Sequence, residues 1–145
     1  MHFAQGGRPR VREAGDYVLQ VRLEPDLLPL DDVRSLAVTV RDAIPVMLVN
    51  GKPSAERLER ASEWLSLSLY PFDESQSVPG YPARPRTLST TQFSDAGLGD
   101  LTRFDCVFFC DVPRLNGSEV ARLETHLRRG GSVVFSLGRN ASKTL

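Results

Sequence analysis

Two segments near the start of the chain alternate between apolar and polar residues. In residues 16–24 the apolar side chains are Tyr17, Leu19, Val21 and Leu23, and in residues 33–41 they are Leu36, Val38 and Val40. A period of two is typical of strands with one buried face, so we expect an antiparallel pair. Two strands alone are marginal in water. We therefore expect the pair to end a β-sandwich whose earlier strands are absent, or to dock on the rest of the chain.

From Ile44 the pattern changes. Residues 44–49 form a continuous apolar run closed by Asn50 and Gly51, which is typical of a parallel strand covered on both faces. A helix is expected next, because Ser54 can act as N-cap and an apolar stripe comes after it at helical spacing. The stripe consists of Leu58, Ala61, Leu65 and Leu69, with Trp64 beside it and Pro71 as the end.

The rest of the chain predicts three more strands and one more helix. Residues 72–86 are rich in proline and predict a long exposed loop before a short strand at 86–92. Residues 104–110 and 132–137 are apolar and predict buried strands. Between them, Asn116 and Glu119 match the N-cap and N3 positions of a helix that Gly130 and Gly131 end.

Strands that alternate with helices predict an α/β fold with a mainly parallel sheet and flanking helices, preceded by the antiparallel β pair. We divide the chain into an irregular start at 1–14, terminal sandwich strands at 15–42 and the α/β domain at 43–145. The first twelve residues lack the apolar core of a secretory signal, and the chain looks truncated at its start.

Composition and charge narrow the range of partners that the chain can be expected to bind. The 145 residues carry 18 basic and 18 acidic side chains. No global field attracts nucleic acid or anionic lipid, so neither is expected as a partner. No apolar run reaches the length of about 18 residues that spans a bilayer, so we expect a soluble chain without direct membrane insertion.

The two cysteines, Cys106 and Cys110, lie four residues apart on one predicted strand. At about 3.3 Å per residue they are about 13 Å apart, too far for a disulfide, so free thiols are expected. With only two histidines and no Cys-x-x-Cys pair, no recognised zinc spacing is present. We predict no metal and no cofactor.

Ligands on open parallel sheets gather at the carboxyl ends of the strands. This rule nominates Asn50, Gly51, Cys110, Asp111, Gly138 and Arg139. Cys110 could be a nucleophile if a base lay within reach, but His126 is expected about 15 Å away, far down the second helix. We interpret Cys110 as a small buried hydrophobe and His126 as a solvated or helix-terminal residue without a role.

A family resemblance rests on three segments, which are 40–51 (VRDAIPVMLVNG), 104–115 (FDCVFFCDVPRL) and 127–138 (LRRGGSVVFSLG). They resemble the class I glutamine amidotransferase-like (flavodoxin-like) domain of large bacterial membrane proteins. The parent proteins belong to the BatA-like aerotolerance-regulator and von Willebrand factor A group, common in planctomycetes. Residues 15–23 (GDYVLQVRL), with Asp26, Leu28, Asp31 and Asp32, resemble the end of the Ig-like segment before that domain. The resemblance covers nearly the whole chain.

Active members of the superfamily carry their cysteine in a Gly-x-Cys-x-Gly elbow after the strand that matches 132–137. Here that place holds Ser-Leu-Gly-Arg-Asn, and the family's histidine and glutamate would come after Leu145. The resemblance therefore implies a non-catalytic interaction or scaffold domain of a larger cell-envelope protein, whose partners are another protein or other domains of that parent.

Two alternatives stay open. One is a small-ligand-binding domain that uses Asn50, Asp111, Gly138 and Arg139 at the strand ends. The other is a thiol-dependent hydrolase or amidotransferase, in which Cys110 is the nucleophile and Asp111 or a partner chain supplies the base.

Overall fold

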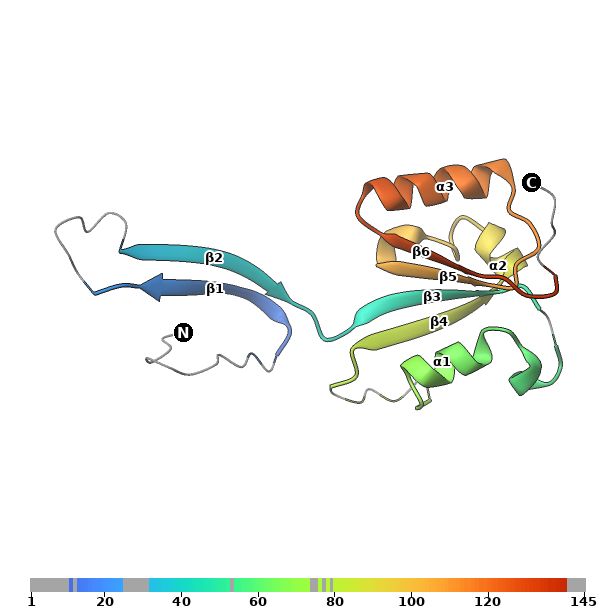
Figure 1. Cartoon of the computed structure of the whole chain (residues 1–145), viewed down its shortest axis with the longest axis horizontal. Coiled ribbons are helices and arrows are strands. Elements are labelled where there is room, and N and C mark those ends of the chain that lie inside the picture. Colours follow the sequence, from blue (N-terminus) through green and yellow to red (C-terminus); the bar gives the residue numbers. More distant parts are fainter. Residues whose placement is uncertain are drawn as a thin grey trace. The chain divides into compact units, whose positions relative to one another are not determined.

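A computed structural model describes residues 11, 13–24, 32–52, 54–73, 76, 78 and 80–140. The chain forms two units, residues 1–42 and residues 43–145. The first contains strands β1 (Gly15–Arg22) and β2 (Val33–Val40). The second contains, in order, β3 (Ile44–Asn50), η1 (Arg57–Glu59), α1 (Glu63–Leu69), β4 (Ala83–Ser89), α2 (Thr90–Ser94), η2 (Leu101–Arg103), β5 (Cys106–Cys110), α3 (Gly117–Arg128) and β6 (Ser132–Ser136) (Figure 1).

In the first unit β1 and β2 pair antiparallel along their whole length, as the alternating pattern predicted. The register places Tyr17 opposite Val38 and Leu19 opposite Leu36, so the apolar side chains share one face. This face is only partly covered, since Leu36 is 61% exposed and Val21 is 63% exposed. The pair therefore presents an apolar surface.

The second unit is built on a four-stranded sheet in the order β4-β3-β5-β6, and all its strands are parallel. An α/β fold with a parallel sheet and a separate antiparallel pair is thus confirmed. The register aligns Ser89, Asn50, Cys110 and Ser136 across the four strands, so their carboxyl ends meet at one edge.

Alternation along the strands sends side chains to two separate cores. Met47, Val49, Val107 and Phe109 pack with Phe93, Leu101 and Leu123 on the face that α3 covers. Val46, Leu48 and Ala83 pack with Leu65 and Leu69 of α1 on the other face. Figure 1 shows α1 and α3 on opposite sides of the sheet. Coverage of both faces explains the continuous apolar run of β3.

Helix α3 begins and ends as the sequence predicts. The Asn116 side chain accepts from the Glu119 N–H at 2.9 Å, and the Glu119 carboxylate accepts from the Asn116 N–H at 2.8 Å. At the other end Gly130 has φ +90°, a conformation that glycine adopts without steric cost, and its N–H bonds the Leu127 carbonyl. Within α3, Leu123 is buried while Leu127 is 51% exposed.

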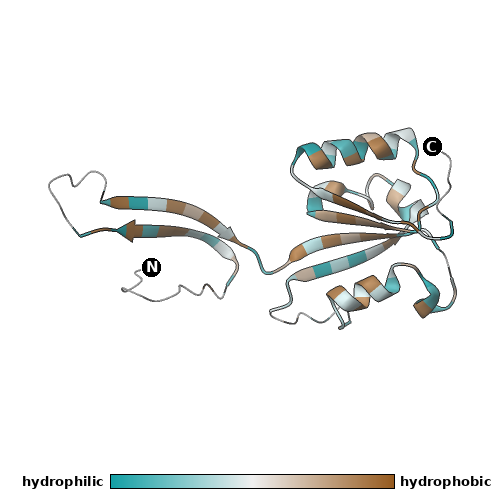
Figure 2. Cartoon of the chain, in the orientation of Figure 1, coloured by the Kyte–Doolittle hydropathy of each residue, from teal (hydrophilic) through white to brown (hydrophobic). Residues whose placement is uncertain are grey.

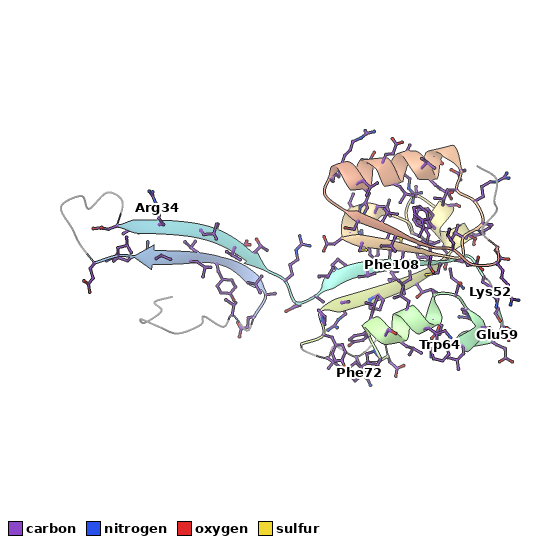
Figure 3. All side chains as sticks on the ribbon, viewed as in Figure 1. Arg34, Lys52, Glu59, Trp64, Phe72 and Phe108 are labelled. Atoms are coloured by element: carbon purple, nitrogen blue, oxygen red, sulfur yellow. The ribbon has the colours of Figure 1, made fainter. Side chains whose placement is uncertain are left out.

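The prediction of a helix capped by Ser54 is wrong. The Ser54 hydroxyl accepts from the Glu56 N–H and donates to Glu59, and the chain forms the short 3-10 turn η1 before α1 begins at Glu63. Local bonds from serine to the backbone compete with a helix in this way. Trp64 is 62% exposed, and its indole N–H donates to the Leu58 carbonyl (Figure 3).

The predicted strand at 86–92 is also misplaced. β4 begins at Ala83 and ends at Ser89, where the short helix α2 comes next. Ser89 forms a capping box with Gln92, and Phe93 of α2 is buried. The prediction extended the strand through these helical residues.

Strand β6 is an edge of the sheet. Ser132 donates to the Asp105 carbonyl, and Ser136 accepts from the Asp111 N–H. Because neighbouring residues of a strand alternate, the backbone groups of Val133 and Phe135 face away from β5. Val134 is 40% exposed and Phe135 55% exposed, and Figure 2 shows β6 as largely hydrophobic.

Candidate functional site

The strand carboxyl ends that the sequence nominated lie side by side. The Gly51 N–H donates to the Cys110 carbonyl, and the Asp111 N–H donates to the Ser136 carbonyl, both at 2.8 Å. These bonds continue the ladders of β3, β5 and β6 beyond the strands. The chain is closely packed here, because a Cβ on Gly51 would lie 2.1 Å from the Asp111 carbonyl oxygen. In this sheet β4 lies on one side of β3 and β5 on the other, and ligands of parallel sheets bind where the strand order reverses in this way. Here the space at the ends of β3 and β5 is filled by the chain itself.

Asp111 occupies the centre of this edge. Its φ of +54° places it in the left-handed region, which asparagine and aspartate enter more readily than most residues. The side chain is buried, and Oδ1 accepts from the Asn140 N–H at 2.8 Å. The carboxylate therefore secures the turn after β6.

Gly138 lies against this carboxylate. A Cβ on Gly138 would come within 2.4 Å of Asp111 Cγ and 2.5 Å of its Oδ1. A cysteine at this position would therefore displace the Asp111 side chain. Arg139, the next residue, is exposed.

Cys110 lies beneath this turn. It is 2% exposed, and burial raises the pKa of its thiol. Burial also raises the pKa of the less enclosed Cys106, and both cysteines are free, as predicted. A thiol must lose its proton to act as a nucleophile, so the surroundings of Cys110 oppose the chemistry that an enzyme would need.

Asn50, another of the nominated residues, borders a cavity. The cavity has a volume of about 460 Å³ beside the carboxyl ends of β3 and β4. Arg60, Glu63 and Gln92 are among its lining residues, and the buried Glu63 carboxylate pairs with Arg57. The Asn50 side-chain oxygen accepts from the Lys52 N–H at 3.2 Å. The sequence did not nominate the arginines, since they lie outside the strand ends.

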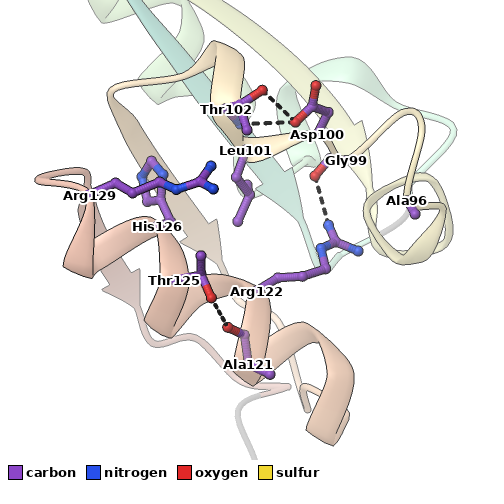
Figure 4. A pocket seen from close by; sticks show the side chains of 10 residues that line it. All are labelled: Ala96, Gly99, Asp100, Leu101, Thr102, Ala121, Arg122, Thr125, His126 and Arg129. Atoms are coloured by element: carbon purple, nitrogen blue, oxygen red, sulfur yellow. Dashed lines mark hydrogen bonds between the residues drawn. The ribbon is translucent and has the colours of Figure 1, made fainter.

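A second cavity of about 410 Å³ lies between α3 and residues 96–102 (Figure 4). Its lining includes Arg122, His126 and Arg129 of α3, with Asp100, Leu101 and Thr102 on the facing segment. The Thr102 hydroxyl and N–H both donate to Asp100, and they hold the pKa of its carboxyl below its ordinary value. The Asp100 carboxylate therefore already accepts two hydrogen bonds from Thr102.

His126 lines the inner part of that cavity. It lies in the last turn of α3, so its prediction as helix-terminal is confirmed, but it is 6% exposed and the solvated alternative is wrong. The ring is buried because Gly131 has no side chain, since a Cβ there would be 2.2 Å from Nε2. Nε2 has no hydrogen-bond partner among the described residues.

Among the described residues, no group of three or more His, Cys, Asp or Glu side chains is placed to hold a metal ion. No helix in the same part of the chain has the length and apolar character to cross a bilayer. The fold and these features define an α/β domain with a filled strand-end edge and with cavities beside the ends of β3 and β4 and along α3. Comparisons with protein-family models, curated proteins and solved structures found no match.

Proposed function

We propose that this chain is a non-catalytic interaction domain of a larger bacterial cell-envelope protein. The observation that carries the proposal is that the side chains of Cys110 and Asp111, at the carboxyl end of β5, are buried within the chain. The Cys110 thiol is buried with a raised pKa, and the Asp111 carboxylate bonds the backbone of Asn140. Both residues stabilise the fold, and neither is offered to a substrate.

A flavodoxin-like, amidotransferase-like domain preceded by an Ig-like segment fits this proposal. In the flavodoxin-like order 2-1-3-4-5 the first four strands neighbour one another as 2-1-3-4. The order β4-β3-β5-β6 is the same arrangement when the strands are numbered from β3. The partly exposed apolar face of β1 and β2 supports their origin at the end of a sandwich.

The interaction surface that we propose is the outer edge of β6. From Ser132 to Gly138 the chain carries no charge, whereas the opposite edge strand β4 contains Arg84, Pro85 and Arg86. Charges and proline protect edge strands from pairing, and β6 lacks both. An added strand from a partner segment would bond the outward-facing backbone groups of Val133 and Phe135 and cover their side chains.

Self-association of the purified chain reports on this edge, with a second copy as the probe. We expect Phe135→Pro to weaken association about fivefold relative to Phe135→Ala, because a lost backbone hydrogen bond costs about 1 kcal/mol. Both variants lose the ring that stacks on Phe109, but only proline also removes the outward N–H. Sedimentation velocity over a concentration series measures the difference. Equal association of the two variants, or a wild-type chain that stays monomeric, would refute the edge as the interaction surface.

A further inference from the structure

The cavity between α3 and residues 96–102 has an excess of positive charge. Arg122 and Arg129 line it and form no ion pair among the described residues, and Asp100 is the one carboxylate in its lining. That carboxylate accepts from Thr102 and lies 3.5 Å from the Arg103 guanidinium. The pKa of the Asp100 carboxyl is lowered by hydrogen bonds from Thr102 and also by the charges of Arg103 and Arg122. One carboxylate thus faces the two lining arginines, and positive charge is in excess.

The Arg122 guanidinium is held in place by the protein. One terminal nitrogen donates to the Phe93 carbonyl at 3.0 Å and to the Gly99 carbonyl at 2.7 Å, and the group lies over the Phe93 ring. A Cβ on Gly99 would come within 2.6 Å of that nitrogen, so glycine is needed for this position. The other N–H groups have no partner among the described residues. A fixed guanidinium with free donors is prepared for an anion.

His126 is a further polar residue in the lining. Its ring is almost fully buried, and Nε2 is one of two buried side-chain polar atoms that lack a hydrogen bond among the described residues. Because Nε2 is enclosed by the protein, the His126 ring forms part of the cavity wall and offers no donor to a ligand. The remaining lining includes the apolar side chains of Ala96, Leu101 and Ala121 (Figure 4).

We propose that this cavity binds a small organic carboxylate with a compact apolar body. The carboxylate accepts hydrogen bonds from Arg122 and Arg129, and the apolar body lies against Leu101 and the two alanines. The volume of about 410 Å³ is within the range of small-molecule sites. The site lies on the flank of α3, away from the strand-end edge, and goes beyond the proposed interaction through β6.

Benzoate is a suitable probe, followed by NMR titration of the purified chain. We expect saturable binding in the millimolar range, with shifts confined to α3 and residues 96–102. Arg129→Ala should weaken binding about tenfold, the loss expected for a charge-assisted hydrogen bond. Arg129 is exposed, so this variant should fold.

The matched control is Arg128→Ala, which removes the same charge from the neighbouring position. Arg128 pairs with Glu124 and does not line the cavity. We expect this variant to bind benzoate within about twofold of the wild type, and uncharged benzamide to bind about tenfold more weakly than benzoate. Absence of saturable binding, or equal losses in the two arginine variants, would overturn the proposal.

Discussion

Replacement of Gly51 by alanine should destabilise the α/β unit by about 3 kcal/mol or prevent it from folding. The added Cβ would lie 2.1 Å from the Asp111 carbonyl oxygen and 2.5 Å from Val112 Cα. Both neighbours are backbone atoms, so no change of rotamer can relieve the overlap. β3 and β5 would have to separate at the edge where Gly51 bonds Cys110. Urea denaturation followed by circular dichroism measures the loss.

Gly117→Ala is the control for this substitution. Gly117 is the first residue of α3, and a Cβ there meets nothing within 4 Å. Alanine favours the helix over glycine by up to about 1 kcal/mol, so this variant should be neutral or slightly more stable. If Gly51→Ala left the free energy of unfolding within about 0.5 kcal/mol of the wild type, the close packing of β3 against Asp111 would be disproved.

The second large effect concerns the Cys110 thiol. We expect iodoacetamide to modify Cys110 in the native chain at neutral pH at least about a hundredfold more slowly than in the unfolded chain. Burial raises its pKa, which lowers the fraction of reactive thiolate, and a side chain that is 2% exposed must wait for local opening. Since a raised pKa keeps the thiol protonated through neutrality, the rate should climb as the pH rises and show no plateau near pH 7.

Cys106 is the internal reference in the same experiment. It is less buried, so it should react faster than Cys110, and peptide mass spectrometry separates the two sites. Rapid modification of Cys110 at neutral pH, with a rate independent of pH, would identify an activated thiolate. That outcome would revive a thiol-dependent enzyme.

The sequence predicts the α/β fold well where one physical signal dominates. The apolar run of β3 and the capping residues Asn116 and Glu119 of α3 fix the bounds of these two elements almost to the residue. They fix the parallel sheet as well, because buried strands that alternate with helices leave few other arrangements. Short elements are harder to predict from the sequence. α2 has five residues and one buried side chain, too few for a helical period, although the capping box of Ser89 and Gln92 marked its start.

The strand-end edge was predictable in position but not in chemistry. Parallel strands place their carboxyl ends together, so Asn50, Cys110, Asp111 and Gly138 could be nominated from strand bounds alone. That Asp111 adopts a left-handed conformation and bonds Asn140, 29 residues away, depends on packing after β6. No local pattern encodes such a contact.

The two cavities escaped prediction for a related reason. The cavity on α3 combines a helix face with residues 96–102, which include the short turn η2 and have no periodic pattern. The helix-terminal position of His126 follows from the sequence, but its burial does not, because it depends on Gly131, whose missing side chain makes room for the ring. The spacing of residues along the helix does not reveal that there is space for the ring beside Gly131.

The central claim is that the chain works by association as part of a larger envelope protein. Its most direct test is the native mass and membrane partitioning of the protein in its own cells, detected with an antibody against this chain. Our account predicts a membrane-bound species much larger than the 16.1 kDa of these residues. A soluble species of about that mass, with no partner, would contradict the account.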